Sequence, residues 1–381
     1  LFGIVPRMQT GLDRIAAGFD HGLRKRRVAL LVNQTAVDAW GRHAVQVFRE
    51  RTDNDVVRLL GPEHGAWGVA QDMEPVAGGA PDEVFGVPTV SLYGADKASL
   101  RPRPEAFDGI DAVVYDLQDI GTRYYTYAAT LALVMEAAAD RGVPVWVLDR
   151  PNPIGPRVEG PLLNAGFESF CGLVPGLPIR HGLTVGALAR WYRERRAPGC
   201  ELTVVPCDKH GRPAWVPPSP NMPTVDTAVV YPGLCFLEGT TVSEGRGTTS
   251  PFLQFGAPGL DAVRVVELLR GRDCPGVDFV PTVFRPAFGK HAGQICQGVY
   301  LRVFDRTAVR AVELGAFVLH ALRTASPGVL GWRTDAYEFE TDKPAIDLLW
   351  GSAELRTTLD RGDDVLALLE KAQKDAAGFR A

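Results

Sequence analysis

Six short apolar runs in the first 205 residues, separated by longer segments, most constrain how this chain can fold. Runs of four to six residues suit either strands or buried helices, so the segments between the runs must show which of the two they are. Apolar residues recur at helical spacing from Tyr127 to Ala138 before Gly142, and 184–196 forms an amphipathic pattern that begins at Thr184. Strands alternating with helices predict an α/β fold with a mostly parallel sheet covered on both faces. The predicted strands are 28–32, 56–60, 88–92, 112–115, 143–148 and 202–205.

The second half of the chain differs from the first in composition and in the pattern of its apolar residues. Pro and Gly are dense between residues 209 and 258, and no period is visible there. We expect long loops that join two domains and line a site. After Gly259 the patterns predict an α+β region, and 381 residues suit about two domains. The helices expected there are 260–270 and 307–323, with two more within 352–379, and the strands are 276–283 and 297–304.

Charge and composition exclude several classes of protein. The formal net charge is −4, whereas a nucleic-acid binder normally carries a basic surplus. No apolar run approaches the ~20 residues of a membrane helix. None of the six cysteines lies in a C-x-x-C pair, which argues against structural zinc and favours buried thiols. The chain starts with Leu-Phe-Gly, so a signal peptide could have preceded it. The location of the protein, which could be secreted, periplasmic or cytoplasmic, therefore stays open.

Polar residues follow four of the predicted strands. Ligands bind at the carboxyl ends of strands in open α/β sheets, so these residues predict a polar crevice at one sheet edge. The alternative is that Asp and Asn only cap helices and turns. The residues concerned are Asn33 after the first strand, Glu63 and His64 after the second, Asp116, Gln118, Asp119 and Arg123 after the fourth, and Arg150 and Asn152 after the fifth.

The motifs that are missing narrow the chemistry. The chain has no G-x-G-x-x-G after its first strand, no P-loop, no H-E-x-x-H and no G-x-S-x-G. Carboxylate chemistry remains, which points to glycosidic hydrolysis. Tyrosines such as Tyr93 and Tyr125 would suit a sugar ring, although packing alone could explain them. The segment 245–248 (GRGT) could instead cradle a phosphate.

Many sequence blocks together resemble one family, the NamZ exo-β-N-acetylmuramidases, long known only as a domain of unknown function. The resemblance implies a bacterial peptidoglycan-recycling glycosidase that removes N-acetylmuramic acid from the non-reducing end of cell-wall fragments. It also implies a Rossmann-like catalytic domain, expected at 1–230, and a smaller α+β domain, expected at 231–381, that closes the cleft. The blocks are GPEHGAWG, VSLYG, YDLQDIGTRYYTY, LDRPNPIG, VEGPLL, RHGLTVGALA, PSPNMPT, YPGLCFLEGTTVSEGRGT, PFLQFGAP and, for the second domain, FETDKPAIDLLWGSAELRTTLDRG.

Glu63 is the first candidate for the catalytic carboxyl. It follows a strand in a loop fixed by Pro62 and Gly65, and a partly apolar pocket would let it hold the proton for the leaving oxygen. The alternative is a structural ion pair with an arginine. Asp119 and Glu244 are candidates for a second group. Retaining, inverting and substrate-assisted mechanisms all stay open.

The remaining candidates would bind substrate. A bidentate arginine could recognise the lactyl carboxylate that distinguishes N-acetylmuramic acid from N-acetylglucosamine. No metal or other cofactor is expected, the partners are muramyl saccharides, and the oligomeric state is open. The predicted binding residues are His64, Asn33, Asp116, Gln118, Arg123, Tyr125, Arg150, Asn152, Asn221 and Arg246.

Two other functions remain as alternatives. One is a non-catalytic binding protein for cell-wall fragments, which would tolerate Gln in place of Glu63. The other is a sugar-phosphate or nucleotide-sugar enzyme, which phosphate would inhibit.

Overall fold

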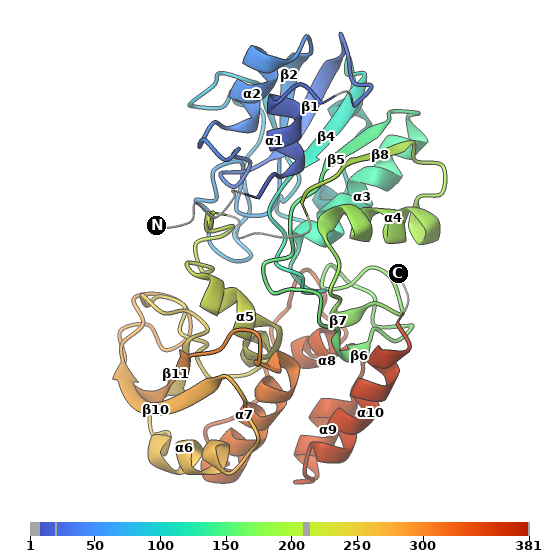
Figure 1. The fold of residues 1–381 in the computed structure, drawn as a ribbon. Coiled ribbons are helices and arrows are strands. Elements are labelled where there is room, and N and C mark those ends of the chain that lie inside the picture. Colours follow the sequence, from blue (N-terminus) through green and yellow to red (C-terminus); the bar gives the residue numbers. More distant parts are fainter. Residues whose placement is uncertain (1–7, 20, 209–213, 380–381) are drawn as a thin grey trace, which may run out of the picture.

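The computed structural model, which describes residues 8–19, 21–208 and 214–379, has two lobes (Figure 1). The first, here called the sheet lobe, contains a six-stranded sheet in the order β3-β2-β1-β4-β5-β8, and every pairing is parallel. The chain thus winds outward from β1 in both directions, as in doubly wound folds. The predicted parallel sheet is confirmed. Its strands are β1 (Arg27–Val32), β2 (Asp55–Gly61), β3 (Thr89–Ser91), β4 (Ala112–Asp116), β5 (Val145–Leu148) and β8 (Leu202–Val205).

Both faces of the sheet are buried, which explains the uninterrupted apolar runs. Alternate residues of β1 enter different cores: Leu30 packs with Phe48 of α2, whereas Leu31 packs with Leu131 of α3. Thr184 caps α4 by accepting the Ala187 N–H, as the sequence predicted. The helices of this lobe are α1 (Gly11–Ala16), α2 (Ala44–Arg51), α3 (Tyr127–Asp140) and α4 (Val185–Arg196), with short turns η1 (Lys97–Leu100) and η2 (Pro104–Phe107).

The second lobe, here called the C-terminal lobe, is a three-stranded antiparallel sheet in the order β10-β11-β9, packed with helices. The predicted strands and helices after Gly259 are confirmed, and one short helix, α8, was not foreseen. The elements are α5 (Val225–Leu234), η3 (Cys235–Gly239), β9 (Gln254–Ala257), α6 (Ala262–Arg270), β10 (Val277–Phe284), β11 (Cys296–Val303), α7 (Ala311–Ala325), α8 (Ala345–Trp350), α9 (Glu354–Asp360) and α10 (Leu366–Ala377).

The expectation of loops throughout 209–258 is wrong in part. Residues 209–213 lie outside the described residues, but α5, η3 and β9 fall inside this stretch. Residues 227 to 234 of α5 are all buried, so the helix has no polar face and hence no amphipathic period. It also contains Pro232, a residue that normally argues against a helix interior.

A hairpin from the first half of the chain packs on the C-terminal lobe. The strands β6 (Glu159–Leu162) and β7 (Pro178–Arg180) pair antiparallel, and β6 contacts α7 and α10. A buried Arg180–Glu159 ion pair at 2.6 Å fixes the hairpin, and Glu159 also accepts the Val312 N–H at the start of α7. The lobes are therefore joined by packing as well as by the chain.

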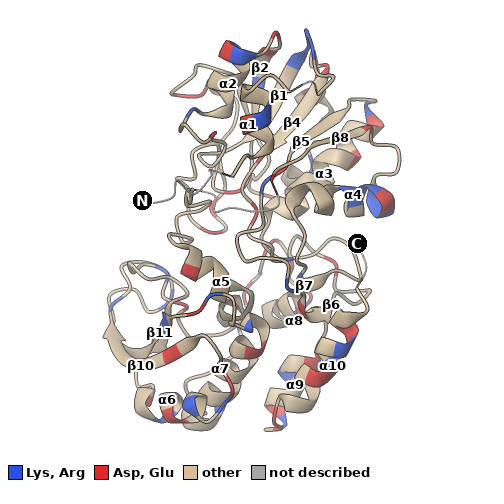
Figure 2. Cartoon of the chain, viewed as in Figure 1, with Lys and Arg blue, Asp and Glu red and all other residues tan. Residues whose placement is uncertain are grey.

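Acidic and basic residues are interspersed over both lobes (Figure 2). All six cysteines are free thiols, and four of them are buried. Among the described residues, no helix combines the length and apolar character needed to cross a membrane.

Candidate active site

A small enclosed pocket lies between the lobes, where loops after β2, β4 and β8 meet the C-terminal lobe. Its free volume is about 20 Å³, and acidic and aromatic side chains dominate its walls. The sheet lobe contributes Glu63, His64, Asp72, Tyr124, Tyr125 and Thr126. The other walls come from Ser219, Asn221, Met222, Tyr231, Glu238, Arg246, Phe252, Tyr337 and Glu338.

Glu63 is positioned by the tight loop that ends β2. His64 and Gly65 both have positive φ, 68° and 81°, so the chain turns sharply directly after Glu63. The carboxylate is 3% exposed and accepts two hydrogen bonds, from the Met73 N–H at 3.3 Å and from Thr126 Oγ1 at 2.5 Å. These donors fix the orientation of the carboxyl group.

Three carboxylates converge in the pocket. One oxygen each of Glu63, Asp72 and Glu338 lies within 4.8 Å of the other two. Glu338 is far from Glu63 and Asp72 in sequence, so the spacing of acidic residues gave no sign that the three form a cluster. Oxygen donors of this kind could hold a divalent cation. They also form a like-charge cluster in which a proton is easily retained.

Glu338 comes from the segment before α8. Its side chain is 4% exposed and accepts a hydrogen bond from Tyr93 Oη at 2.9 Å. Burial, together with the nearby charges of Glu63 and Asp72, holds the pKa of Glu338 well above its usual range. Burial likewise raises the pKa of Asp72, against the opposing effect of Arg246.

Arg246 links the acidic groups on one side of the pocket. Its guanidinium lies 2.7 Å from Glu238, 3.0 Å from Asp72 and 3.4 Å from Glu244. Burial raises the pKa of Glu238. Burial acts in the same direction on Glu244, but Lys290, at 2.8 Å, and Arg246 outweigh it, so the pKa of Glu244 is lowered.

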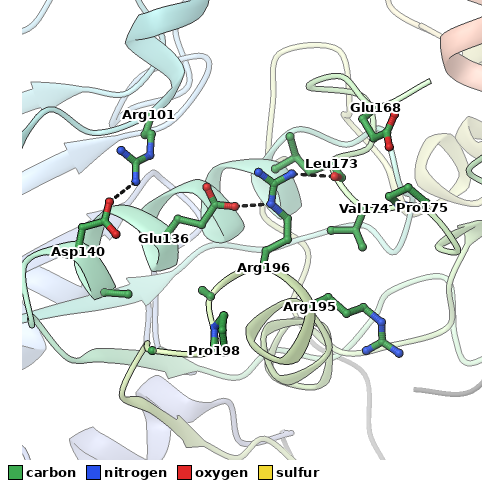
Figure 3. A pocket seen from close by; sticks show the side chains of 13 residues that line it. Arg101, Glu136, Asp140, Glu168, Leu173, Val174, Pro175, Arg195, Arg196 and Pro198 are labelled. Atoms are coloured by element: carbon green, nitrogen blue, oxygen red, sulfur yellow. Dashed lines mark hydrogen bonds and ion pairs between the residues drawn. The ribbon is translucent and has the colours of Figure 1, made fainter. Parts of the chain in front are cut away.

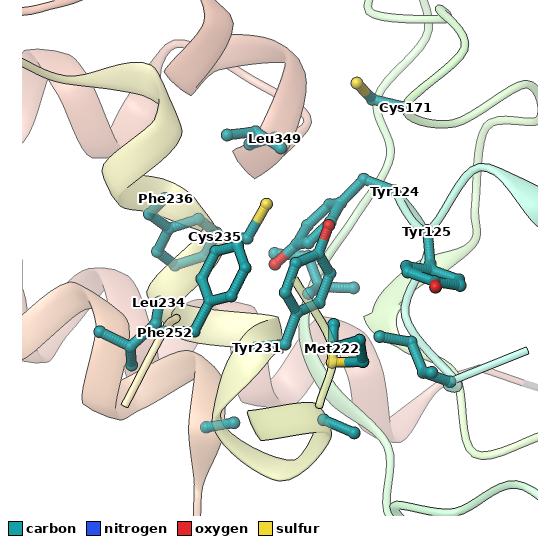
Figure 4. Packing of buried hydrophobic residues seen from close by; sticks show 14 of the residues in the cluster. Tyr124, Tyr125, Cys171, Met222, Tyr231, Leu234, Cys235, Phe236, Phe252 and Leu349 are labelled. Atoms are coloured by element: carbon teal, nitrogen blue, oxygen red, sulfur yellow. The ribbon is translucent and has the colours of Figure 1, made fainter. Parts of the chain in front are cut away.

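Aromatic rings form the opposite wall and continue into the core shared by the lobes (Figure 4). Tyr231 of α5 lies edge-on to Tyr125 and to Phe252, with ring centroids 5.9 Å and 4.9 Å apart. The Tyr124 hydroxyl donates to the Pro232 carbonyl of the same helix. Such rings offer flat apolar faces to a sugar beside the polar carboxylates.

Five of the predicted site residues line the pocket, and a sixth lies beside it. Nδ1 of His64 is 2.9 Å from the Ala70 carbonyl. Asn221 donates to Gln71 at 3.1 Å. Glu244 contacts the pocket through its ion pair with Arg246. The five lining residues are Glu63, His64, Tyr125, Asn221 and Arg246.

Other predicted residues form buried structural bonds at the carboxyl edge of the sheet. Arg150 pairs bidentately with Asp116, at 2.5 and 2.9 Å. Asn33 is fully buried and donates to Tyr127 Oη, while its own oxygen accepts from Thr35. Gln118 donates to the carbonyls of Asp119 and Pro151. Side chains bonded in this way are not available to a ligand.

Arg123, Asn152 and Asp119 also lie outside the pocket lining. The Arg123 guanidinium is fully buried and donates to the carbonyls of Pro161, Leu177 and Leu349, so it ties the hairpin to α8. Asn152 bonds the backbone at Leu183 and Ile154. Asp119 accepts the Gly121 N–H at 2.6 Å, and burial raises its pKa to about 7.

The sequence reasoning missed three acidic residues of the pocket, Asp72, Glu238 and Glu338. It also missed the hydroxyl-bearing residues Thr126, Ser219, Tyr231 and Tyr337. Glu238 lies in a block that was recognised, YPGLCFLEG, but no strand precedes it. Asp72 and Glu338 lie in segments with no period. Loop conformation alone brings them to the pocket, and a single sequence contains little information about it.

A larger hollow lies elsewhere on the described surface. It measures about 730 Å³ and is an open depression between α3 and α4 (Figure 3). Its charged groups are already paired, Arg101 with Asp140 and Arg196 with Glu136. Open shape and satisfied charges make it a weaker candidate than the acidic pocket.

Comparisons with known proteins cover nearly the whole chain. Residues 28–226 match the family model "Exo-beta-N-acetylmuramidase NamZ, N-terminal", and residues 229–381 match its C-terminal counterpart. A Bacillus subtilis protein, "Peptidoglycan beta-N-acetylmuramidase NamZ", is 38% identical over 98% of this chain and 89% of its own.

Two crystal structures of DUF1343 family proteins from Bacteroides fragilis have similar folds. The first has a TM-score of 0.84 at 31% identity and covers 97% of both chains. The second has a TM-score of 0.74 at 26% identity and covers 98% of this chain and 96% of its own.

Proposed function

This chain belongs to the NamZ family of exo-β-N-acetylmuramidases along both halves of its length, and from that premise we infer that it is a glycosidase acting on peptidoglycan fragments. It releases N-acetylmuramic acid from their non-reducing ends. The observation that supports this activity in the structure is the enclosed acidic pocket around Glu63. Carboxyl groups are the groups that most glycosidases use to cleave a glycosidic bond.

The charge of the pocket suits the reaction. Positive charge develops on the sugar ring as the glycosidic bond breaks. Glu63, Asp72 and Glu338 lie together, and Arg246 is shared among three carboxylates, so the pocket keeps acidic groups next to the ring. Fixed groups aimed at developing charge are usually the largest contribution to catalysis.

Arg246 is proposed to recognise the lactyl carboxylate. Of the three arginines that the sequence suggested, it lines the pocket, whereas Arg123 and Arg150 are used in structural bonds. An arriving carboxylate would share this guanidinium with Asp72, which lies at the pocket wall and whose pKa is raised by burial. Protonation of Asp72 would release its share of the Arg246 guanidinium to the substrate, while Glu238 and Glu244 keep their ion pairs with Arg246.

The phosphate alternative loses support. In the segment Gly245–Thr248, a Cβ on Gly247 would meet backbone atoms of Phe288 at 2.5 Å, so the loop is packed against the chain.

The function is tested with chromogenic β-muramides. We expect the purified protein to release N-acetylmuramic acid and to act weakly on the matching N-acetylglucosaminide, because only the muramide offers a carboxylate to Arg246. Equal rates on both would refute lactyl recognition. The Glu63→Gln variant should lower kcat about 10²–10⁴-fold. A variant with normal turnover would favour a binding protein instead.

The same assay tests for a metal. The three clustered carboxylates could hold a cation, but hydrolysis by carboxyl groups needs none. We expect activity to survive exhaustive chelation with EDTA. Loss of activity that a divalent cation restores would contradict this expectation.

A further inference from the structure

We propose that Glu338 is the second catalytic residue, the carboxyl that protonates the glycosidic oxygen, and that it works with Glu63 in a reaction that retains the anomeric configuration. This proposal rests on the muramidase function proposed above. It gives that site a proton donor from the C-terminal lobe, opposite the carboxylate from the sheet lobe.

The first support is the position of Glu338. One of its oxygens lies within 4.8 Å of oxygens of Glu63 and Asp72. Tyr93 Oη holds Oε2 at 2.9 Å, which leaves Oε1 for the pocket. The Tyr93 ring is itself packed against Phe339 and Phe170, with ring centroids 5.6 and 6.0 Å away. The carboxyl is thus aimed by a rigid neighbour.

The second support is the backbone that presents Glu338. Tyr337 and Glu340 exchange two backbone hydrogen bonds, of 2.9 and 3.0 Å, which places Glu338 and Phe339 at the tip of a tight turn. Both tip residues have positive φ, 48° and 65°. The left-handed conformation is unfavourable for any residue other than glycine. Such conformations gather at functional sites, where the surrounding structure maintains them.

The third support is the division of hydrogen bonds between the two glutamates. Glu63 accepts from a backbone N–H and a hydroxyl, which fix the direction of its carboxyl group. Glu338 is buried beside two other carboxyls, and its pKa is raised well above the usual range. Close carboxylates cannot all ionise, so the proton resides on Glu338.

A separate observation marks this pocket as a ligand site. Tyr125 is 5% exposed and lines the pocket, yet its hydroxyl, close to Ser219, makes no hydrogen bond of ordinary geometry with any described residue. A buried hydroxyl without a bond is costly. A sugar hydroxyl or amide would satisfy it.

The separation of the carboxyls predicts the stereochemistry. Retaining glycosidases hold their two carboxyl groups about 5–5.5 Å apart, and inverting enzymes about 6.5–9.5 Å, to leave room for water. Here the oxygens lie within 4.8 Å. This gap is nearer to the retaining range than to the inverting range, and on that ground the pair is assigned to the retaining class.

Each step then balances. Glu338 gives its proton to the glycosidic oxygen as the bond from that oxygen to C1 breaks, and a Glu63 carboxylate oxygen forms a bond to C1 from the opposite face. A water molecule next attacks C1 on the face that the leaving sugar vacated. Its proton returns to Glu338, the bond from C1 to Glu63 breaks, and the Glu63 carboxylate is restored. The product is N-acetylmuramic acid that is initially the β anomer.

The first test follows the product by proton NMR during wild-type hydrolysis of a β-muramide. The β anomer should appear first and then mutarotate. If the α anomer appears first, the reaction inverts and the proposal is overturned. A wild-type protein that cleaves no muramide would instead refute the proposed function, so the two failures are distinguishable.

The second test uses Glu338→Gln with Glu340→Gln as the matched control, since Glu340 lies two residues away and pairs with Lys97. On a disaccharide, whose leaving group needs a proton, Glu338→Gln should lower kcat by about 10²–10⁴-fold. With a nitrophenyl leaving group the loss should be much smaller in kcat/KM, which reports the first step, although kcat also falls because Glu338 is the base of the second step. The control should keep wild-type rates. Equal losses of kcat/KM on both substrates, or none, would overturn the role.

Azide distinguishes the two glutamates. Glu338→Ala with azide should regain activity and yield the β-glycosyl azide, because the anion attacks the Glu63-bound sugar without needing a base. Glu63→Ala with azide should yield the α-glycosyl azide. Failure of both rescues in variants that melt at the wild-type temperature would overturn the assignment. Glu338→Gln removes a buried carboxyl next to like charges, so we expect no loss of melting temperature.

Discussion

At the scale of single residues, burial decides what each acidic group does. Asp116 is paired with Arg150 and belongs to the sheet edge, whereas Asp119, three residues later, is buried with one unpaired oxygen. Glu244 is held between two cations, and Glu338 between two carboxyls. The type of residue is the same in each case, and only the neighbours determine whether it is structural or chemically active.

Asp119 predicts a pH dependence of stability. Burial raises its pKa to about 7 in the folded protein, from the usual 3.8 of an aspartate. Between these values the folded state holds a proton that the unfolded state has lost. The free energy of unfolding should therefore fall as the pH rises from about 4 to about 7, by up to roughly 1.4 kcal/mol per pH unit from this group.

The Asp119→Asn variant removes this contribution. Urea unfolding at pH 5, 6, 7 and 8 should show the stability of the variant rising relative to wild type as the pH increases. Asp140→Asn is the control, because that carboxylate is exposed and paired only with Arg101. A constant difference between Asp119→Asn and wild type at all four pH values would contradict the prediction.

At the scale of elements, the site depends on the helix α5, which could not be predicted from the sequence. The strands of the sheet lobe were predictable because each is a compact apolar run, and α3, α4, α6 and α7 because their periods are regular. The helix α5 is buried on all sides and contains Pro232, so it lacks both a period and favourable composition. Glu63 was found because it follows a strand. Glu338 follows no helix or strand, so the sequence could not identify it as a site residue.

Close packing of α5 on α7 gives a prediction at this scale. A Cβ on Gly233 would lie 1.9 Å from the Ala311 carbonyl oxygen and 2.7 Å from the Gly315 nitrogen. Gly233→Ala should therefore destabilise the protein by at least about 1–3 kcal/mol, the usual cost of overpacking. It should also lower activity, because α5 carries Tyr231 into the pocket.

Chemical denaturation with a parallel activity assay measures both effects. Gly199→Ala is the control, since a Cβ there meets nothing within 4 Å, and we expect a change within about 0.5 kcal/mol. Wild-type stability in Gly233→Ala would show that the two helices separate more easily than their packing indicates.

At the scale of the whole molecule, the pocket lies between the two lobes, and residues of both lobes bond across it. Asp72 meets Arg246 and Tyr93 meets Glu338 across it, and each pair combines one residue from either lobe. The free volume of about 20 Å³ is too small for a sugar ring. Substrate entry therefore requires the walls to part, and binding should hold both lobes together.

Product binding tests this view. N-acetylmuramic acid at 100 times its Kd should stabilise the protein by about 2.7 kcal/mol, if it binds only the folded state. Hydrogen exchange should slow in both lobes, around Met73 and around Tyr337. N-acetylglucosamine, which lacks the lactyl carboxylate, should protect less. Slower exchange in one lobe alone would mean that the ligand does not bridge the pocket.

The enclosed shape of the pocket has a consequence for how the enzyme meets its polymer. A site walled by both lobes admits a terminus and excludes the middle of a strand, so what it senses is the number of glycan ends and not the mass of glycan. A fixed mass cut into pieces half as long presents twice as many ends and, below saturation, should be degraded twice as fast. Its output is therefore governed by whatever activity shortens the strands beforehand.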